Sequence, residues 1–131
     1  MKRTLLTTTL VVALAMPMCA LEIVDFDALS VTRRTAYMND LVDAAMRSLY
    51  RDEQYGDYTA LRALFGYDTP GRARIPRGMI EFADNIDMAR ALAEKNPGRV
   101  VHVEDALAAT LRNSGIEPPD DLMTLMSKPR G

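Results

Sequence analysis

The chain carries one histidine and one cysteine, and nucleophilic or metal chemistry would begin with these residues. His102 stands among valines, and no serine of the chain lies in the G-x-S-x-G turn of a hydrolase nucleophile. A lone histidine also lacks the second donor at helical spacing that a zinc site needs. We therefore expect His102 to be structural, and we predict no catalytic residues, no metal ligands and no cofactor.

Neighbouring carboxylates are the second candidate for chemistry. The pairs are Asp84 with Asp87, Glu104 with Asp105, and Asp120 with Asp121. A glycoside hydrolase needs two carboxylates that face each other across the substrate, and the pKa of at least one must be raised. The last two pairs fall in predicted first turns of helices, where negative charge complements the helix dipole. Helix capping is the preferred interpretation, and a small hydrolase or lyase acting on cell-wall or polyanionic glycan is the alternative function.

One stretch concentrates the side chains that dominate protein interfaces. Most tyrosines lie between residues 50 and 67, and three arginines follow just before a predicted helix. Tyrosine buries a large area at low entropic cost, and arginine offers a rigid bidentate fork. Arginines oppose the preference for acidic residues in a first helical turn, unless an anion or an internal carboxylate such as Glu81 compensates them. The predicted partner-binding residues are Tyr55, Tyr58, Tyr67, Arg72, Arg74 and Arg77.

Residues 1–20 have the order of a cleavable signal peptide. Lys2 and Arg3 precede an apolar run of roughly ten residues, shorter than the roughly 20 that span a bilayer. We expect cleavage after Ala20; cleavage after Ala15 offers a better match in small residues but cuts into the apolar run. Cys19 lacks the small and aliphatic residues that precede a lipidated cysteine, so we expect it to be removed with the leader.

Cleavage after Ala20 leaves residues 21–131 as a single helical domain, long enough for a modest hydrophobic core. This mature chain has no cysteine, so disulfides do not stabilise it. Removal of Lys2 and Arg3 lowers the formal net charge from −2 to −4. We therefore expect no nucleic-acid partner, and no stable membrane anchor once the leader is removed.

The spacing of apolar residues predicts a mainly α fold, a bundle of four or five helices. Ser30 is the expected N-cap of a helix of about 20 residues, and Gly66 and Gly115 are the expected ends of two others. After the first helix, the predicted helices cover residues 58–65, a stretch from Pro76 to Asn96, a stretch ending at Asn113, and residues 121–127. Residues 21–26 are expected to form an extended arm or short strand, and residues 100–103 either pair with it or begin a helix.

These observations favour a periplasmic or secreted, non-enzymatic protein. We expect it to bind another protein or an acidic surface in an accessory, inhibitory or immunity-like role. Its oligomeric state is left open.

Overall fold

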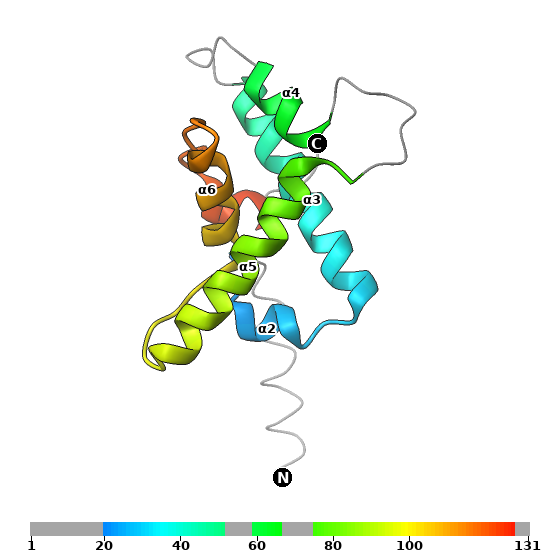
Figure 1. Cartoon of the computed structure of the whole chain (residues 1–131). Helices are drawn as coiled ribbons and strands as arrows, with labels where there is room; N and C mark the ends of the chain where they lie inside the picture. Colours follow the sequence, from blue (N-terminus) through cyan, green and yellow to red (C-terminus); the bar gives the residue numbers. More distant parts are fainter. Residues whose placement is uncertain (1–19, 52–58, 67–74, 128–131) are drawn as a thin grey trace.

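The computed structural model describes residues 20–51, 59–66 and 75–127, and over these ranges the chain is mainly helical, as predicted (Figure 1). The order of elements is α2 (Ile23–Asp27), α3 (Val31–Arg51), α4 (Thr59–Phe65), α5 (Arg77–Lys95), α6 (Val103–Asn113) and the 3-10 helix η1 (Leu122–Ser127). The mainly helical prediction, with four or five helices, is thus confirmed; five helices follow Ser30 in these ranges, and the last has the tighter 3-10 form.

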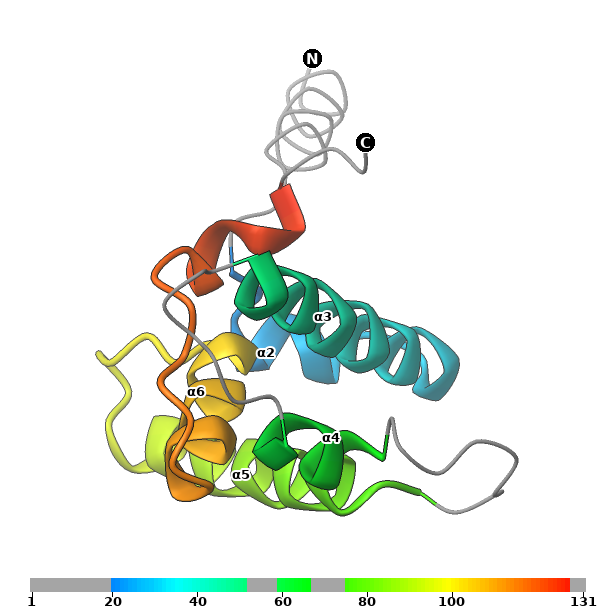
Figure 2. The same ribbon diagram turned by 90° about the horizontal axis from the view of Figure 1, so that it is seen from above.

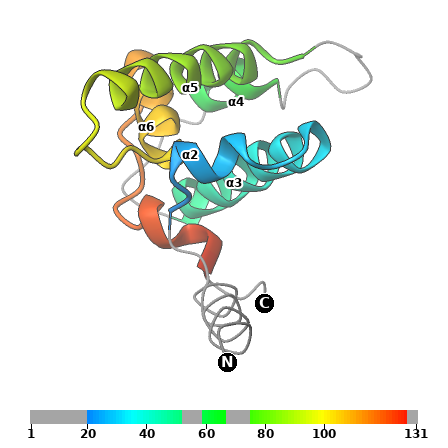
Figure 3. The same ribbon diagram turned by 90° about the horizontal axis from the view of Figure 1, so that it is seen from below.

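The helices form two layers. Figures 2 and 3 show α2 and α3 on one side of the domain and α4 and α5 on the other, with α6 beside them at one end. Helix α5 packs against α6, α4 and α2, whereas η1 packs against α3 and α6. The hydrophobic core fills the space between the layers and draws side chains from every one of these helices.

Helical spacing decides which side chains of the two longest helices enter this core. In α3 the buried residues are Leu41, Val42, Ala45, Met46 and Leu49. The buried residues of α5 are Gly78, Phe82, Ile86 and Ala89. Their recurrence at three- and four-residue intervals places them on one stripe of each helix.

Helix ends also follow the chemistry of their residues. The Ser30 hydroxyl oxygen accepts a hydrogen bond from the Arg33 N–H at 3.2 Å, which satisfies a donor of the first turn of α3. Gly66 and Gly115 follow α4 and α6 with φ angles of 70° and 77°, in the left-handed region that favours glycine. Pro76 directly precedes α5, where its missing N–H leaves no helical hydrogen bond unmade.

The segment before α3 differs from the prediction. Residues 21–26 were expected to be extended, but Ile23–Asp27 form helix α2. Only Glu22 keeps the extended form, in an isolated antiparallel bridge with His102. The loose alternation in this segment also places Ile23 and Phe26 three residues apart, so one helical turn buries both. Residues 100–103 were expected either to pair with this segment or to begin a helix. Both are found in part, because His102 forms the bridge with Glu22 and α6 begins at Val103.

The predicted leader lies outside the described residues, apart from Ala20, and Cys19 is among those outside. Within the described ranges, no helix is both long enough and apolar enough to cross a membrane.

Candidate functional site

Arg77 is the one residue of the predicted tyrosine and arginine patch that the structure describes. Tyr55, Tyr58, Tyr67, Arg72 and Arg74 lie outside the described residues. Arg77 stands in the first turn of α5, and its guanidinium forms an ion pair with the Glu81 carboxylate at 3.3 Å. For this arginine, the internal carboxylate that the sequence suggested is present. Its side chain is still 60% exposed, so the charge faces solvent.

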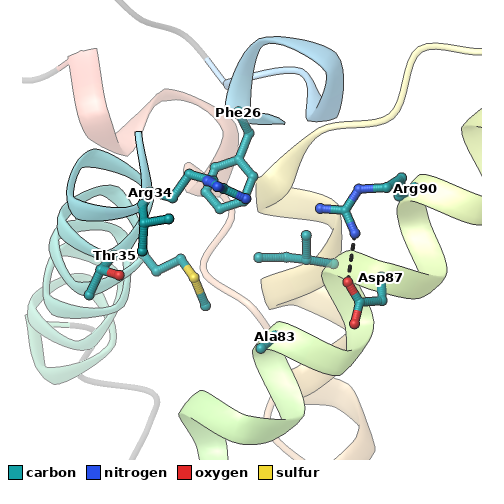
Figure 4. A pocket seen from close by; sticks show the side chains of 9 residues that line it. Phe26, Arg34, Thr35, Ala83, Asp87 and Arg90 are labelled. Carbon is teal, nitrogen blue, oxygen red and sulfur yellow. Dashed lines mark hydrogen bonds and ion pairs between the residues drawn. The ribbon is translucent and has the colours of Figure 1, made fainter. Parts of the chain in front are cut away.

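A second feature, which the sequence did not reveal, is an open groove between α2, α3 and α5. Its volume is about 240 Å³. Figure 4 shows Phe26, Arg34 and Thr35 on one side of the groove and Ala83, Asp87 and Arg90 on the other. The full lining consists of Phe26, Val31, Arg34, Thr35, Met38, Ala83, Ile86, Asp87 and Arg90. We refer to this set as the α2–α3–α5 groove.

The inner wall of the groove is apolar. Phe26 and Ile86 are each 3% exposed and belong to the core, and the partly buried Met38 packs against the same core. Val31 stands at the rim with 69% of its surface exposed. Apolar surface at such a place is removed from water when a partner's side chain enters the groove.

Arg90 joins two carboxylates at one edge of the groove. Its guanidinium donates two hydrogen bonds to Asp27, at 2.7 Å and 2.6 Å, and a third to Asp87 at 2.6 Å. The fork fastens α2 to α5 in the bidentate geometry that arginine favours with carboxylates. The hydrogen bonds from Arg90, with smaller help from the charges of Arg90 and Arg34, hold the pKa of Asp27 below its usual value.

Arg34 differs from Arg90 because one of its donors is unsatisfied. Its Nε atom is buried, and within the described ranges no acceptor hydrogen-bonds to it. A buried donor without an acceptor costs on the order of 1–3 kcal/mol. Arg34 thus lines the groove with a partly exposed side chain, while its buried Nε atom lacks an acceptor in the described ranges.

Glu104 is the other unusual charged residue, and it does not line the groove. Only 1% of its surface is exposed, although it stands in the first turn of α6. One carboxylate oxygen accepts a hydrogen bond from the Leu21 N–H at 3.0 Å, and the other accepts one from the Tyr37 hydroxyl. Burial raises the pKa of Glu104, while the bonds from Tyr37, its own N–H and the Leu21 N–H act in the opposite direction. Burial and the neighbouring carboxylate likewise raise the pKa of Tyr37.

Two other carboxylates of the predicted pairs, Asp105 and Asp121, have structural partners. Asp105 accepts a hydrogen bond from the His102 N–H at 2.9 Å, which makes His102 the first residue of an N-terminal cap of α6. Asp121 accepts a hydrogen bond from the Ser48 hydroxyl at 3.1 Å and so links η1 to α3. Capping therefore accounts for Asp105. Glu104 also stands in the predicted first turn, but capping does not account for its burial or for its bonds from Leu21 and Tyr37.

One sequence signal could have identified Glu104 as an inward-facing residue. It precedes Ala108 by four positions and Leu111 by seven, and both of these are buried. This is the spacing of one helix face. The groove offers no such signal, because its lining comes from three helices that are distant in the chain.

Metal binding finds no support in the described ranges, where no three His, Cys, Asp or Glu side chains gather closely enough to hold an ion. Comparison with protein-family models, with curated proteins and with solved structures gives no match for this chain.

Proposed function

We propose that this chain is an exported, non-enzymatic helical protein that binds another protein, in an accessory, inhibitory or immunity-like role. The observation that carries the proposal is the α2–α3–α5 groove, in which a buried, unsatisfied N–H of Arg34 adjoins an apolar wall. A partner that brings both an apolar side chain and an oxygen acceptor satisfies both parts of this surface.

The size of the groove favours a protein segment over a small organic ligand. Pockets for drug-sized molecules enclose roughly 300–1,000 Å³. At about 240 Å³ and open to solvent, the groove holds one or two side chains of a partner. The rest of such a segment would lie across the exposed rim at Val31 and Thr35.

The charges around the groove favour an acidic segment. Arg90 already has two carboxylate partners, whereas the Arg34 Nε atom lacks an acceptor within the described ranges. A carboxylate of the partner would form the stronger, charge-assisted kind of hydrogen bond with the partly exposed Arg34 guanidinium. The predicted patch of Tyr55, Tyr58, Tyr67, Arg72, Arg74 and Arg77 is proposed as a second contact of the same acidic partner.

Export is the other part of the proposal, and it rests on the leader-like order of residues 1–20. The mature chain would act in the periplasm or after secretion.

The binding experiment compares two adjacent arginines of α3. The tagged full-length chain is expressed in its native host, recovered from the exported fraction, and its partner is identified by mass spectrometry. Affinity for that purified partner is then measured for the unmodified protein, Arg34→Met and Arg33→Met. Met keeps most of the apolar stem of the side chain and removes the guanidinium, and Arg33 is exposed and outside the groove.

We expect Arg34→Met to weaken binding at least about tenfold, the effect of losing one charge-assisted hydrogen bond. Arg33→Met should bind as the unmodified protein does. Equal affinities for all three proteins would remove the groove from the proposal. A combined Arg72→Ser, Arg74→Ser and Arg77→Ser variant tests the second contact in the same assay, and undiminished binding would remove that contact.

The glycan-hydrolase alternative receives less support from the geometry. A general acid needs a carboxyl whose pKa is raised at the substrate site. The pKa of Asp27, beside the groove, is lowered, and Glu104, whose pKa is raised, lies away from the groove lining. Turnover of peptidoglycan or acidic polysaccharide by the purified protein, lost on substitution of one carboxylate, would reverse this preference.

A further inference from the structure

We propose that cleavage after Ala20 converts the Leu21 nitrogen into an α-ammonium group that forms an ion pair with the buried carboxylate of Glu104. The inference rests on the export part of the proposed function and adds to it a structural role for the new chain end. Cleavage then does more than release the protein, because it supplies the positive charge that a buried carboxylate lacks.

The position of the Leu21 nitrogen carries the inference. This nitrogen lies 3.0 Å from a carboxylate oxygen of Glu104, a hydrogen-bonding distance that also suits an ammonium group. Leu21 is the residue that becomes the first of the chain if cleavage follows Ala20. The predicted cleavage position and the residue that contacts the buried carboxylate are therefore the same.

The neighbouring backbone keeps Leu21 in place without the leader. The Leu21 carbonyl oxygen accepts a hydrogen bond from the Val103 N–H at 2.8 Å. The Ile23 N–H donates to the Val101 carbonyl oxygen at 2.9 Å, and these bonds flank the bridge between Glu22 and His102. Leu21 itself packs against the core. The hydrogen bonds of Leu21 and Ile23, and the packing of Leu21 against the core, thus hold the chain end beside Glu104.

The surroundings of Glu104 explain why a charge is needed there. The donors to its carboxylate are the Tyr37 hydroxyl, the Leu21 N–H and its own N–H, and all three are neutral before cleavage. Throughout the described ranges, no arginine or lysine forms an ion pair with Glu104, and the nearest titratable base is the half-buried His102. Burial of a carboxylate without a cation is strongly unfavourable, whereas a paired and hydrogen-bonded carboxylate is tolerated.

The chemistry of the step is hydrolysis of one peptide bond by a signal peptidase. Water adds across the Ala20–Leu21 bond, and the bond between the Ala20 carbonyl carbon and the Leu21 nitrogen breaks. Ala20 leaves with a carboxylate, and the Leu21 nitrogen takes up protons to become an ammonium group at neutral pH. Partial exposure of Leu21 lets the N–H groups that do not face Glu104 remain hydrated.

The inference also distinguishes the two cleavage sites that the sequence offers. Cleavage after Ala15 would leave Leu21 inside the chain with a neutral amide nitrogen, and its positive charge would lie five residues away. Only cleavage after Ala20 places the ammonium group at the atom that contacts Glu104. Intact-mass measurement of the exported protein should therefore give a chain that begins at Leu21, and any other first residue would overturn the inference.

The ion pair itself is tested with two forms of residues 21–131, one with a free α-amino group and one acetylated at the Leu21 nitrogen. These residues include every buried apolar side chain of the described ranges. The pKa of the α-amino group is measured by NMR with ¹⁵N-labelled leucine, and the thermal midpoint of each form is measured at pH 7. Glu104→Gln and the control Glu117→Gln, at a carboxylate 82% exposed, are made in both forms.

We expect the pKa of the α-amino group to lie above about 8, its value in an unpaired chain end. Acetylation should lower the thermal midpoint by about 4–8 °C, and Glu104→Gln should abolish both effects while Glu117→Gln preserves them. An unshifted pKa together with equal midpoints in the unmutated protein would overturn the ion pair, even if Glu104→Gln does not fold. Both readouts use the isolated chain, so this failure is distinguishable from a failure of partner binding, and the intact mass tests export separately.

Discussion

The buried site around Glu104, with Leu21 and Tyr37, lies on one side of an aromatic contact, and the α2–α3–α5 groove lies on the other. Their charged side chains have opposite environments. The rings of Phe26, in the groove, and Tyr37, bound to Glu104, meet edge to face with centroids 6.5 Å apart. On the Tyr37 side, a carboxylate is closed off from solvent and held by neutral donors. On the Phe26 side, Arg90 forms ion pairs with the carboxylates of Asp27 and Asp87 at a partly exposed edge. Arg34, on the same side, has a donor without an acceptor in the described structure.

The difference shows how environment assigns roles to the same residue types. Burial dominates at Glu104 and raises its pKa, whereas hydrogen bonds from arginine dominate at Asp27 and lower its pKa. Both carboxylates fasten the N-terminal segment to a distant helix, α6 in one case and α5 in the other. The buried Nε–H of Arg34 has no acceptor in the described structure, and for this reason we propose the groove, rather than the Glu104 site, as the binding surface.

The largest expected effect is that of Glu104→Ala on stability. The substitution removes the acceptor of both the Leu21 N–H and the Tyr37 hydroxyl and leaves space in a buried site. We expect the free energy of unfolding to fall by about 3 kcal/mol, as urea denaturation would measure it. Glu117→Ala is the exposed control and should change it by less than about 0.5 kcal/mol. Similar losses for the two variants would remove the distinction between a buried and a solvated carboxylate.

A smaller loss of stability is expected for Arg90→Ala. Its side chain is 31% exposed and that of Asp27 is 35% exposed, so solvent screens the pair. After allowance for this screening, we expect a loss of about 1 kcal/mol in the free energy of unfolding at pH 7. Arg33→Ala serves as the control outside the cluster. A loss as large as that of Glu104→Ala would show that the groove edge is as important for folding as the buried centre.

The two centres should also respond to pH in opposite directions. Because the folded pKa of Asp27 is lowered, its stabilising contribution is present above the unfolded value of 3.8 and is lost as the pH falls through the folded pKa. The destabilisation by Arg90→Ala should therefore shrink between pH 5 and about pH 2. Thermal midpoints of Arg90→Ala and the unmodified protein across this range measure it, and a pH-independent difference would contradict the assignment.

For Glu104 the sign reverses in the form acetylated at Leu21. Its folded pKa is raised above 4.5, so the contribution of Glu104 is fully present below that pH and is lost as the pH rises through the folded pKa. Relative to acetylated Glu104→Gln, the acetylated protein should thus lose stability on going from pH 4 to pH 7. Tyr37 and His102 are the titratable groups that face this carboxylate, and Tyr37 stays neutral over this range. The opposite slope would mean that burial does not dominate at Glu104.

The helices were predictable because their signals are local. Apolar spacing around Leu41 and Phe82, a serine before α3 and a glycine after α4 each act within a few residues. Helix α2 was missed because a short alternating segment fits a strand and a single helical turn equally well. In the structure, one helical turn places both Ile23 and Phe26 in the core.

The candidate site was less predictable from the sequence, because the groove forms only when three helices that are distant in the chain pack together. Phe26, Arg34 and Asp87 share a groove through the packing of three helices, and no spacing along the chain places them together. The predicted patch was chosen by composition, and Arg77, its described member, has a carboxylate partner of its own. The burial of Glu104 similarly depends on Leu21, which lies 83 residues earlier in the chain.

The smallest expected effect on stability belongs to Arg34→Met, and this variant tests the central claim most directly. The substitution should not lower the free energy of unfolding, since it removes a buried N–H that lacks an acceptor in the described structure. The decisive measurement is the affinity of this folded variant for the identified partner, beside that of Arg33→Met. The account predicts that Arg34→Met binds at least about tenfold more weakly while Arg33→Met binds normally. Equal binding by the two variants would contradict it.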